Sequence, residues 1–600
     1  MEVTNGILGA FLTLYPLEQT IEFPVPALFP SCTDRKAWEG LSSEKKEEID
    51  RLYAQYEREA FPVLRASDYM AFVHRKDRQS MERPYFLRRK KLMAVLLHYG
   101  LHRNELDAVS LGDMIWSICE ESTWVLSAHN NGHPLPDPFD PVLDLFAAQT
   151  GMLLSLSLLL TREDPDALCS QIRERAEEEI WKRVIRLFEN RNDFWWTGFT
   201  ARKDLNNWTP WIVSNVMLCA CVCVRDKQRL CSLLTRACLM LDRYIDFMPA
   251  DGGCDEGAAY WNVAGGSLMD ALELLSQVTR GRASFWKNPK IKALLTYPAG
   301  VWLGGRYFVN FADCDARPYL SSERLRTAGR MTGNTAMIAL GCNMDIGLQA
   351  GFSDTPQLWR LLNYLFEPSA DEPDEAVPCR DLYMPDLMLR IREAGGMTLV
   401  CKGGTNHESH NHNDVGSFMV FAGEDPQIVD AGNMTYSGLT FSDQRYTLWN
   451  TRSRNHNVPL IGQTEQEAGE NRGAKEVRCL EDGLEADLTG AYPEGTALSV
   501  KRTLRNTGEG ILIRDKIVLP REESVTYVFL LRYVPRITPG CVMTGGIRIK
   551  ADPRMTVNSE EIPVNDPRMA NSWPGSLYRL TFVTEKSLER EDTFEITLNR

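Results

Sequence analysis

The hydrophobic pattern of this 600-residue chain changes its period once, close to residue 370. Before that point apolar residues recur three and four positions apart, which is the spacing of helices with one buried face. Gly- and Pro-containing breaks separate the helical segments, so we expect short helices that pack as successive antiparallel pairs in an (α/α) toroid. The clearest of these segments are Lys45–Ala60, Phe86–Leu101, Pro141–Leu160 and Leu233–Met248.

Beyond residue 380 apolar residues alternate with polar ones or form runs of strand length, and turn residues separate them. This pattern predicts an antiparallel β-sandwich. The segments that carry it most clearly are Met397–Cys401, Gly416–Ala422, Gly510–Leu519, Ser524–Val534, Leu577–Thr584 and Asp592–Leu598. The acidic, Pro-containing stretch before them is typical of a linker. We therefore predict an α+β chain of two domains: a helical toroid at 1–370, a linker at 371–380 and a β-sandwich at 381–600.

The chain carries an excess of negative charge. Lys and Arg number 67 against 81 Asp and Glu, which gives a net charge of −14. This balance argues against a protein that binds nucleic acid or an anionic membrane. An anionic ligand would need a local site that offsets the overall charge.

The N-terminal apolar stretch lacks the marks of a secretion signal. Glu2 precedes it, no basic residues flank it and no small-residue cleavage site follows. The longest apolar run, Met152–Leu160, is shorter than the roughly 20 residues that span a bilayer. We therefore expect a cytoplasmic protein with no membrane segment.

The cysteines fit the same expectation. Their number, fifteen, is odd, and they show no paired spacing. Five of them lie in apolar sequence of helical period, where reduced core thiols are favoured over a metal cluster. These are Cys219, Cys221, Cys223, Cys231 and Cys238.

Sequence motifs for nucleotide and protease chemistry are absent. The chain has no G-x-x-x-x-G-K-[ST], no Rossmann glycine triplet after a strand, no H-E-x-x-H and no G-x-S-x-G. We expect no nucleotide or redox cofactor.

Four of the nine histidines cluster in the β region: His407, His410, His412 and His456. On an extended strand His410 and His412, two residues apart, would project to one face. His412 and His456 together with Asp430 would offer a divalent metal such as Zn²⁺ two imidazoles and one carboxylate. The alternative is that these residues form local hydrogen bonds at hairpin ends.

Amides and aromatic rings gather at three places in the helical region, a combination common in sugar-binding sites. Asn206 and Asn207 lie among tryptophans, Tyr260 follows a Gly-rich turn, and Trp124 and His129 mark a helix exit. Helix capping and core packing are the competing roles for each of them.

Several segments, taken in order, resemble the heparinase II/III family of polysaccharide lyases. SHNHNDVGSF, VDAGNMTY and RYTLWNTRSRNHNVPLIG are similar to its C-terminal signature, and ICEESTWVLSAHN, LDLFAAQTG and NNWTPW are similar to its helical part. The resemblance covers roughly residues 60 to 600. It implies an (α/α) toroid joined to an antiparallel β-sandwich, with the active site between them.

The resemblance also implies roles for individual residues. Asn206 would neutralise the substrate carboxylate, Tyr260 and His410 would be catalytic, and a supporting metal would bind His412, Asp430 and His456. Substrate-binding residues would be Asn207, the alternative neutraliser, together with Trp124, His129, Tyr436 and Arg445. His407 and Glu408, which depart from the family pattern, receive no role.

The implied reaction is β-elimination on a uronate-containing glycan, a glycosaminoglycan such as heparin or heparan sulfate, which leaves a 4,5-unsaturated uronate end. We expect action on oligosaccharides from a chain end. Two other classes stay open: a toroid glycoside hydrolase using carboxylates among Asp251, Asp255 and Glu256, and a non-catalytic carbohydrate-binding protein. The sequence leaves the oligomeric state open, a homodimer included.

Overall fold

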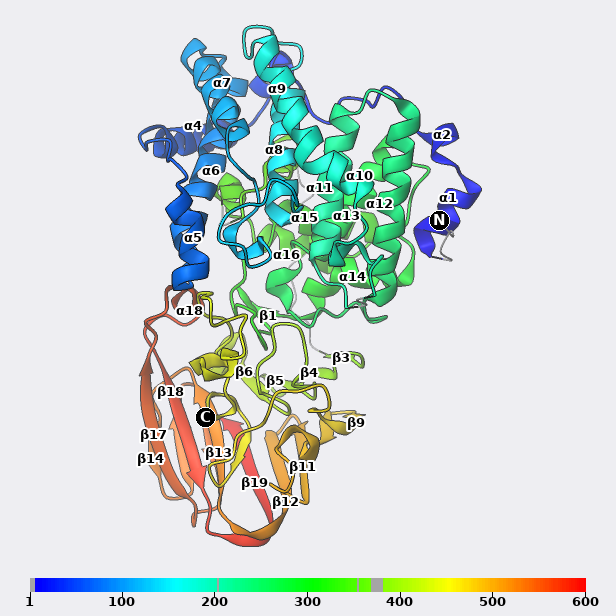
Figure 1. Ribbon diagram of the computed structural model, residues 1–600. Coiled ribbons are helices and arrows are strands. Elements are labelled where there is room, and N and C mark those ends of the chain that lie inside the picture. Colours follow the sequence, from blue (N-terminus) through cyan, green and yellow to red (C-terminus); the bar gives the residue numbers. More distant parts are fainter. Residues whose placement is uncertain (1–5, 202–203, 353–354, 368–380, 600) are drawn as a thin grey trace. The chain divides into compact units, whose positions relative to one another are not determined.

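The computed structural model describes residues 6–201, 204–352, 355–367 and 381–599 (Figure 1). Contacts divide the chain into two compact units. The first comprises Met1–Met248, Asn262–Leu295 and Leu320–Asp374, and the second comprises Pro249–Trp261, Thr296–Tyr319 and Glu375–Arg600. Two short segments from the helical part of the sequence therefore belong to the second unit, which the sequence did not predict. The predicted linker at 371–380 lies outside the described residues.

The helical part of the chain forms where the period-3.6 pattern predicts it. The four clearest predicted segments correspond to α4, α6, α8 and α12. The helices are α1 Ile7–Leu14, α2 Leu17–Thr20, α3 Arg35–Glu39, α4 Ser43–Glu57, α5 Ala66–Arg75, α6 Gln79–His102, α7 Glu105–Cys119, α8 Leu145–Leu160, α9 Ser170–Ile180, α10 Arg186–Asn190, α11 Trp208–Cys223, α12 Lys227–Phe247, α13 Gly265–Val278, α14 Pro289–Gly300, α15 Ser322–Thr332, α16 Thr335–Asn343 and α17 Leu358–Phe366.

Helices α8 and α11 form the centre of this unit. Every residue of α8 is buried, as its uniformly apolar sequence requires, and α8 packs against α11, which in turn packs against α12 and α13. Asp144 begins α8, because its carboxylate accepts the N–H groups of Phe146 and Ala147 at 3.1 and 2.7 Å. Four of the five helical cysteines are buried here, and Cys223 is half-buried.

The C-terminal part forms two antiparallel sheets, and all the predicted strand segments are strands. One sheet has the order β17-β18-β13-β7-β6-β5-β4-β3, with β8 pairing β13, and the other β14-β15-β16-β19-β12-β11-β10-β9. The strands are β3 Asp381–Met384, β4 Leu389–Ala394, β5 Met397–Lys402, β6 Phe418–Ala422, β7 Asp425–Ile428, β8 Pro459–Ile461, β9 Lys475–Leu480, β10 Gly483–Asp487, β11 Ser499–Asn506, β12 Ile511–Glu523, β13 Val525–Leu531, β14 Arg536–Thr538, β15 Cys541–Thr544, β16 Ile547–Lys550, β17 Thr556–Pro563, β18 Ser576–Val583 and β19 Ser587–Leu598.

The two sheets enclose one hydrophobic core. Leu399, Phe418 and Phe529 come from one sheet and Ile513 and Phe594 from the other, and all five are fully buried. In β12 buried and more exposed residues alternate, as expected when one face of a sheet is packed. This arrangement confirms the predicted combination of a helical array with an antiparallel β-sandwich.

A buried ion pair joins two neighbouring strands of one sheet. Arg502 on β11 binds Asp515 on β12 through two hydrogen bonds of 2.7 and 2.6 Å. The same guanidinium donates to the carbonyl oxygens of Gly416 and Asn457 at 2.9 and 2.7 Å. Arg502 therefore holds two loops that carry the candidate histidines.

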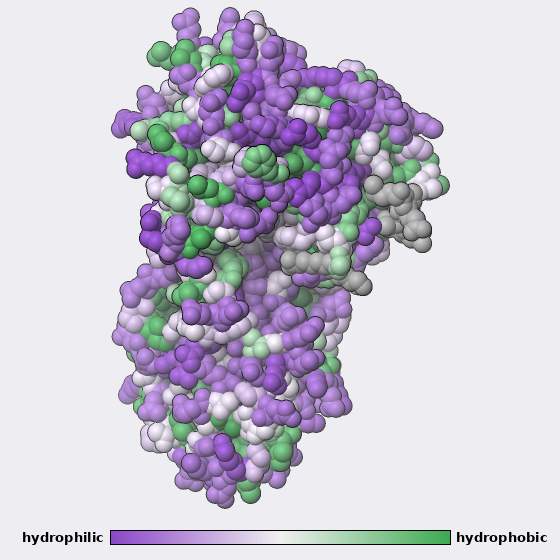
Figure 2. All heavy atoms as spheres, viewed as in Figure 1, coloured by the Kyte–Doolittle hydropathy of each residue, from purple (hydrophilic) through white to green (hydrophobic). Residues whose placement is uncertain are grey.

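None of the described helices combines the length and the apolar character that crossing a bilayer takes. The face shown in Figure 2 is mostly hydrophilic.

Candidate functional site

His410 and His412 lie in a loop between β5 and β6, not on a strand. The extended geometry that the sequence suggested for them is therefore wrong. His410 has φ of +56°, a left-handed conformation that costs energy for a residue with a Cβ. Such strain persists only where the surroundings enforce it, and it is frequent at functional sites.

One carboxylate nevertheless joins both rings. Asp313, in the segment 296–319, accepts from His410 Nδ1 at 2.9 Å and from His412 Nε2 at 2.9 Å. Arg445 lies 2.9 Å from the same carboxylate. Burial by itself would raise the pKa of Asp313, but the two imidazoles and the guanidinium outweigh it and hold the pKa well below its usual range. Asp313 is thus ionised and fixes the orientation of both histidines.

Two tyrosine hydroxyls meet at His410. Tyr260 Oη lies 3.4 Å from His410 Nδ1 and Tyr436 Oη lies 3.1 Å from the same nitrogen. The two hydroxyls also hydrogen-bond each other. Burial raises the pKa of both tyrosines, so both hydroxyls are protonated and available as acids.

Glu256 lies on the other side of the His410 ring, with 3.6 Å between its Oε1 and His410 Nε2. Burial by itself would lower the pKa of His410, but Glu256 and then Asp313 more than offset it, and the pKa is raised. Since Nδ1–H donates to Asp313, Nε2 is the nitrogen that can exchange a proton with another group.

His412, Asp430 and His456 come together as the sequence predicted. All three are buried, and one ligand atom from each lies within 4.8 Å of the others. His456 Nε2 donates to the carbonyl oxygen of Asn450 at 2.9 Å, which leaves Nδ1 facing Asp430 at 2.8 Å. His412 uses Nε2 for Asp313, and its Nδ1 is buried without a hydrogen-bond partner among the described residues.

This donor set fits a divalent metal. Each ring has its Nε2 held by an oxygen, the arrangement usual for metal-bound histidines, while the Nδ1 of His412 has no partner among the described residues and that of His456 contacts the third ligand, Asp430. Burial, the largest effect, lowers the pKa of His412 and keeps the ring neutral, as a ligand must be. Burial would raise the pKa of Asp430, but His456 outweighs it and the carboxyl is ionised.

Arg445 makes several contacts within the second unit. Besides its contact with Asp313, its Nε donates to the carbonyl oxygen of Asn411 and a terminal nitrogen donates to that of Thr440, each at 3.0 Å. Only 9% of the residue is exposed. Arg445 therefore helps to position Asp313, and its role in substrate binding stays a prediction.

Asn206 and Asn207 begin helix α11 in the first unit. The carboxamide oxygen of Asn206 accepts the N–H of Trp208 at 3.0 Å, so the amide NH₂ is the end that can donate to a ligand. Asn207 is buried. Asn206 can therefore cap the helix and bind a ligand at the same time, because capping uses the amide oxygen and binding would use the NH₂ group.

Trp124 and His129 belong to the packing of the same unit. Trp124 is 1% exposed and its indole N–H donates to the carbonyl oxygen of Ile118. It is therefore a core residue, and the predicted binding role is wrong. His129 Nδ1 donates to the Asp144 carboxylate at 2.8 Å, and its ring lies against Trp208 with centroids 4.8 Å apart. Its outer edge remains partly exposed.

The sequence analysis did not name Asp313 or Arg568. It named Glu256 only as a possible carboxylate of a hydrolase. Arg568, on α18 (Pro567–Ser572), binds Asp315 and lies over the Tyr436 ring at 5.0 Å. Only the excess of acidic residues around the Asp313–Asp315 segment, ADCDARP, hinted at a site there.

Glu408 and His407 now have defined surroundings. Glu408 pairs with buried Lys402 at 2.9 Å, and Lys402 also binds Asp414 at 2.7 Å. The pair anchors the loop that carries His410. His407 is exposed on that loop.

Two of the three carboxylates considered for a hydrolase, Asp251 and Asp255, accept backbone N–H groups, whereas Glu256 faces His410. Asp251 accepts the N–H groups of Gly253 and Asp386, each at 2.9 Å. Asp255 accepts that of Ser409 at 3.1 Å. Both carboxylates therefore have a structural role in the turn that carries Tyr260 and in the loop that carries His410.

Residues 382–584 match the family model "Heparinase II/III-like, C-terminal". No curated protein matches the chain.

Solved structures match almost the whole chain at low identity. A heparan sulfate lyase HepC mutant from Pedobacter heparinus aligns with a TM-score of 0.60 and 13% identity, covering 92% of this chain and 88% of that one. A heparinase III aligns with a TM-score of 0.59 and 12% identity, covering 97% and 93%. A Streptomyces coelicolor A3 chondroitin AC lyase in complex with chondroitin sulphate aligns with a TM-score of 0.56 and 11% identity, covering 94% and 82%. These likenesses confirm the fold.

Proposed function

We propose that this protein is a polysaccharide lyase acting on a uronate-containing glycan. The proposal starts from the match of residues 382–584 to the heparinase II/III-like C-terminal family model. The reaction removes the C5 proton of the uronate and expels the oxygen at C4. It therefore needs a group that stabilises the carboxylate, a base and an acid. The observation that carries the proposal is the cluster of half-buried Tyr260, Tyr436 and His410 around buried Asp313, which supplies proton donors and a base within hydrogen-bond reach of one another.

Tyr260 would protonate the leaving oxygen. Burial keeps its hydroxyl protonated in the free protein, which suits an acid. Where the C5 hydrogen and the leaving oxygen lie on the same face, as in a glucuronate, Tyr260 can serve as base and then acid. Where they lie on opposite faces, as in an iduronate, His410 is the natural base, acting through Nε2.

Asn206 would hydrogen-bond the uronate carboxylate and stabilise the charge that develops on it. Its anchored carboxamide oxygen leaves the NH₂ group as a donor of fixed direction. Asn207 stays the alternative neutraliser, and His129 an additional contact.

The metal proposed at His412, Asp430 and His456 would support the site. When bound, it would supply a positive charge and hold the loops of His412 and His456 together, without taking a proton step. Through Asp313 it would also fix the loop that carries His410.

We expect elemental analysis of protein purified without chelator to find Zn²⁺ or a similar ion, and His412→Ala to contain one equivalent less and to melt at a lower temperature. The reason is that a closed, buried site contributes its binding free energy to folding. Equal metal content and equal melting temperature in the variant would return these three residues to a purely hydrogen-bonding role.

Asp313→Asn is expected to lower kcat by about 10², because the loss of charge frees His410 from its orientation while the shape is kept. KM should change little, since Asp313 is buried behind the ring and acts through it. Asp386→Asn, which alters an exposed carboxylate of the same unit, is the control. A kcat within about threefold of the parent would show that His410 does not need Asp313.

The test of the reaction class is the ultraviolet absorbance of the unsaturated uronate product. Only a lyase generates this chromophore, whereas a hydrolase releases reducing ends without it and a binding protein releases nothing. A panel of heparan sulfate, heparin, chondroitin sulphate and alginate oligosaccharides would also identify the substrate, which we propose to be of the heparin or heparan sulfate type. No absorbance with any member of the panel would overturn the proposal.

We further propose that the enzyme works in the cytoplasm on oligosaccharides, from a chain end. Two features support this: core thiols in α11 and α12, typical of a reducing compartment, and a net charge of −14, which disfavours long polyanions. A loss of viscosity that runs ahead of the release of small products would indicate internal cutting instead.

A further inference from the structure

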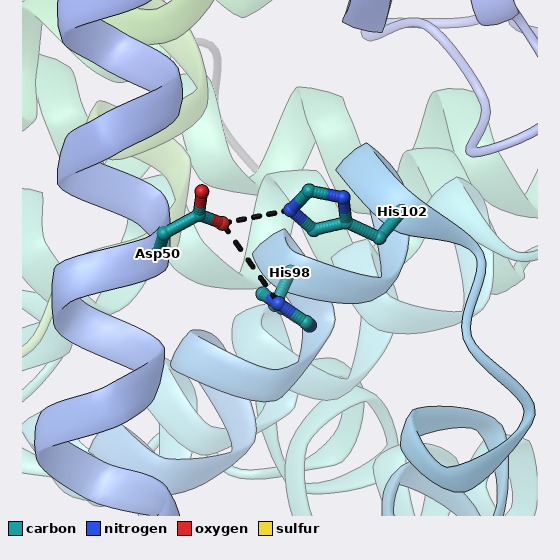
Figure 3. A group of neighbouring side chains, drawn as sticks. All are labelled: Asp50, His98 and His102. Atoms are coloured by element: carbon teal, nitrogen blue, oxygen red, sulfur yellow. Dashed lines mark hydrogen bonds and ion pairs between the residues drawn. The ribbon is translucent and has the colours of Figure 1, made fainter.

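Helices α4 and α6 of the first unit place three potential metal ligands together, far along the chain from the histidines of the β-sandwich (Figure 3). His98 and His102 are one turn apart on α6, so both side chains lie on the same helix face. Asp50 projects from α4 toward them. Its Oδ1 lies 2.7 Å from His102 Nε2 and 3.8 Å from His98 Nε2.

The ring of His98 is fixed in the orientation that ligation requires. Its Nδ1 bonds Asp107 on α7 at 2.6 Å, and Asp107 is 1% exposed. The ring of Tyr53 stacks on it with centroids 3.7 Å apart and an interplanar angle of 13°. A buried carboxylate on one nitrogen and a free second nitrogen is the usual arrangement of a metal-bound imidazole.

The other two ligands are open to solvent. The side chain of His102 is 44% exposed and that of Asp50 is 50% exposed, against 14% for His98. A cation could therefore enter without any rearrangement of the helices, and a water molecule could complete its coordination.

We propose that Asp50, His98 and His102 bind one divalent cation of the zinc class. Two imidazoles and one carboxylate are the ligands of Zn²⁺ and its neighbours in the transition series, whereas Ca²⁺ and Mg²⁺ select oxygen ligands. The cation would join α4 to α6, and none of its three ligands is among the residues proposed for the lyase site.

The test uses Co²⁺ as a spectroscopic probe on the full chain after chelation. The parent protein is expected to bind one equivalent of Co²⁺ more than His102→Asn does, or to bind that equivalent at least about tenfold more tightly. His133→Asn, which removes an exposed histidine from the loop before α8, should bind as much Co²⁺ as the parent. His102 is exposed, so its replacement leaves the fold intact.

A second variant tests the orientation of His98. Asp107→Asn keeps all three ligands but removes the carboxylate behind the ring, and it is expected to weaken the same Co²⁺ equivalent by about 10- to 100-fold. If His102→Asn binds as many equivalents as the parent, with less than a tenfold change in affinity, the three residues are an ion-pair cluster and the proposal is wrong. Zn²⁺ in competition should displace the cobalt absorption from this site in the parent.

Discussion

Tyr260→Phe is expected to lower kcat by a factor of about 10² to 10⁴, the usual contribution of a general acid or base. The substitution keeps the ring against His410, where the centroids lie 4.9 Å apart, and removes only the hydroxyl. Binding of substrate and melting temperature should therefore stay close to those of the parent, and the loss should fall on kcat. The measurement is the initial rate of product absorbance on the best substrate of the panel.

Two further variants make this result specific. Tyr492→Phe removes another buried hydroxyl, one that donates to the carbonyl oxygen of Pro459 at 2.6 Å inside the sandwich, and should leave kcat unchanged. Tyr436→Phe removes the hydroxyl that shares a hydrogen bond with Tyr260. If Tyr260→Phe keeps the parent rate to within about threefold while Tyr436→Phe loses it, Tyr436 is the proton donor and our assignment is wrong.

Asp515→Asn is expected to lower the free energy of unfolding by about 3–5 kcal/mol, because it leaves the charge of Arg502 buried without a counter-ion. Arg502 is 2% exposed and Asp515 is fully buried. The guanidinium also binds the carbonyl oxygens of Gly416 and Asn457, so the loops next to His412 and His456 should loosen with it. Denaturant unfolding followed by the β-sheet signal in circular dichroism measures the effect.

The neighbouring pair on the same strand provides a matched control. Arg505 binds Asp482 at 2.9 Å, but the arginine side chain is 51% exposed. Asp482→Asn should cost less than about 1 kcal/mol, since an exposed pair is solvated in both states. Equal losses in Asp515→Asn and Asp482→Asn would mean that burial does not govern the strength of these pairs.

Patterns that repeat along the chain made the fold class predictable from the sequence. The spacing of apolar residues in Lys45–Ala60 already contains the buried face of α4, formed by Ile49, Leu52 and Tyr56, and the alternation in Gly510–Leu519 contains the inward face of β12. Such patterns are local, since a helix or strand must bury the residues on one side. The grouping of His412, Asp430 and His456 was predictable because four of the nine histidines fall between residues 407 and 456, close to an Asp.

The surroundings of the catalytic residues depended on tertiary structure alone. Asp313 lies 97 residues from His410 and 99 from His412, Tyr260 lies 150 residues from His410, and no periodicity links such distant segments. Burial and neighbouring charge then set what each group does: the same burial that keeps His412 neutral is outweighed at His410 by Glu256 and Asp313. Residue types and local spacing thus determined the elements and the candidate ligands of this protein. Only the folded chain decided that Arg445 holds Asp313 and that Trp124 is core, because hydrogen bonding and solvent exposure are properties of residues that meet in space.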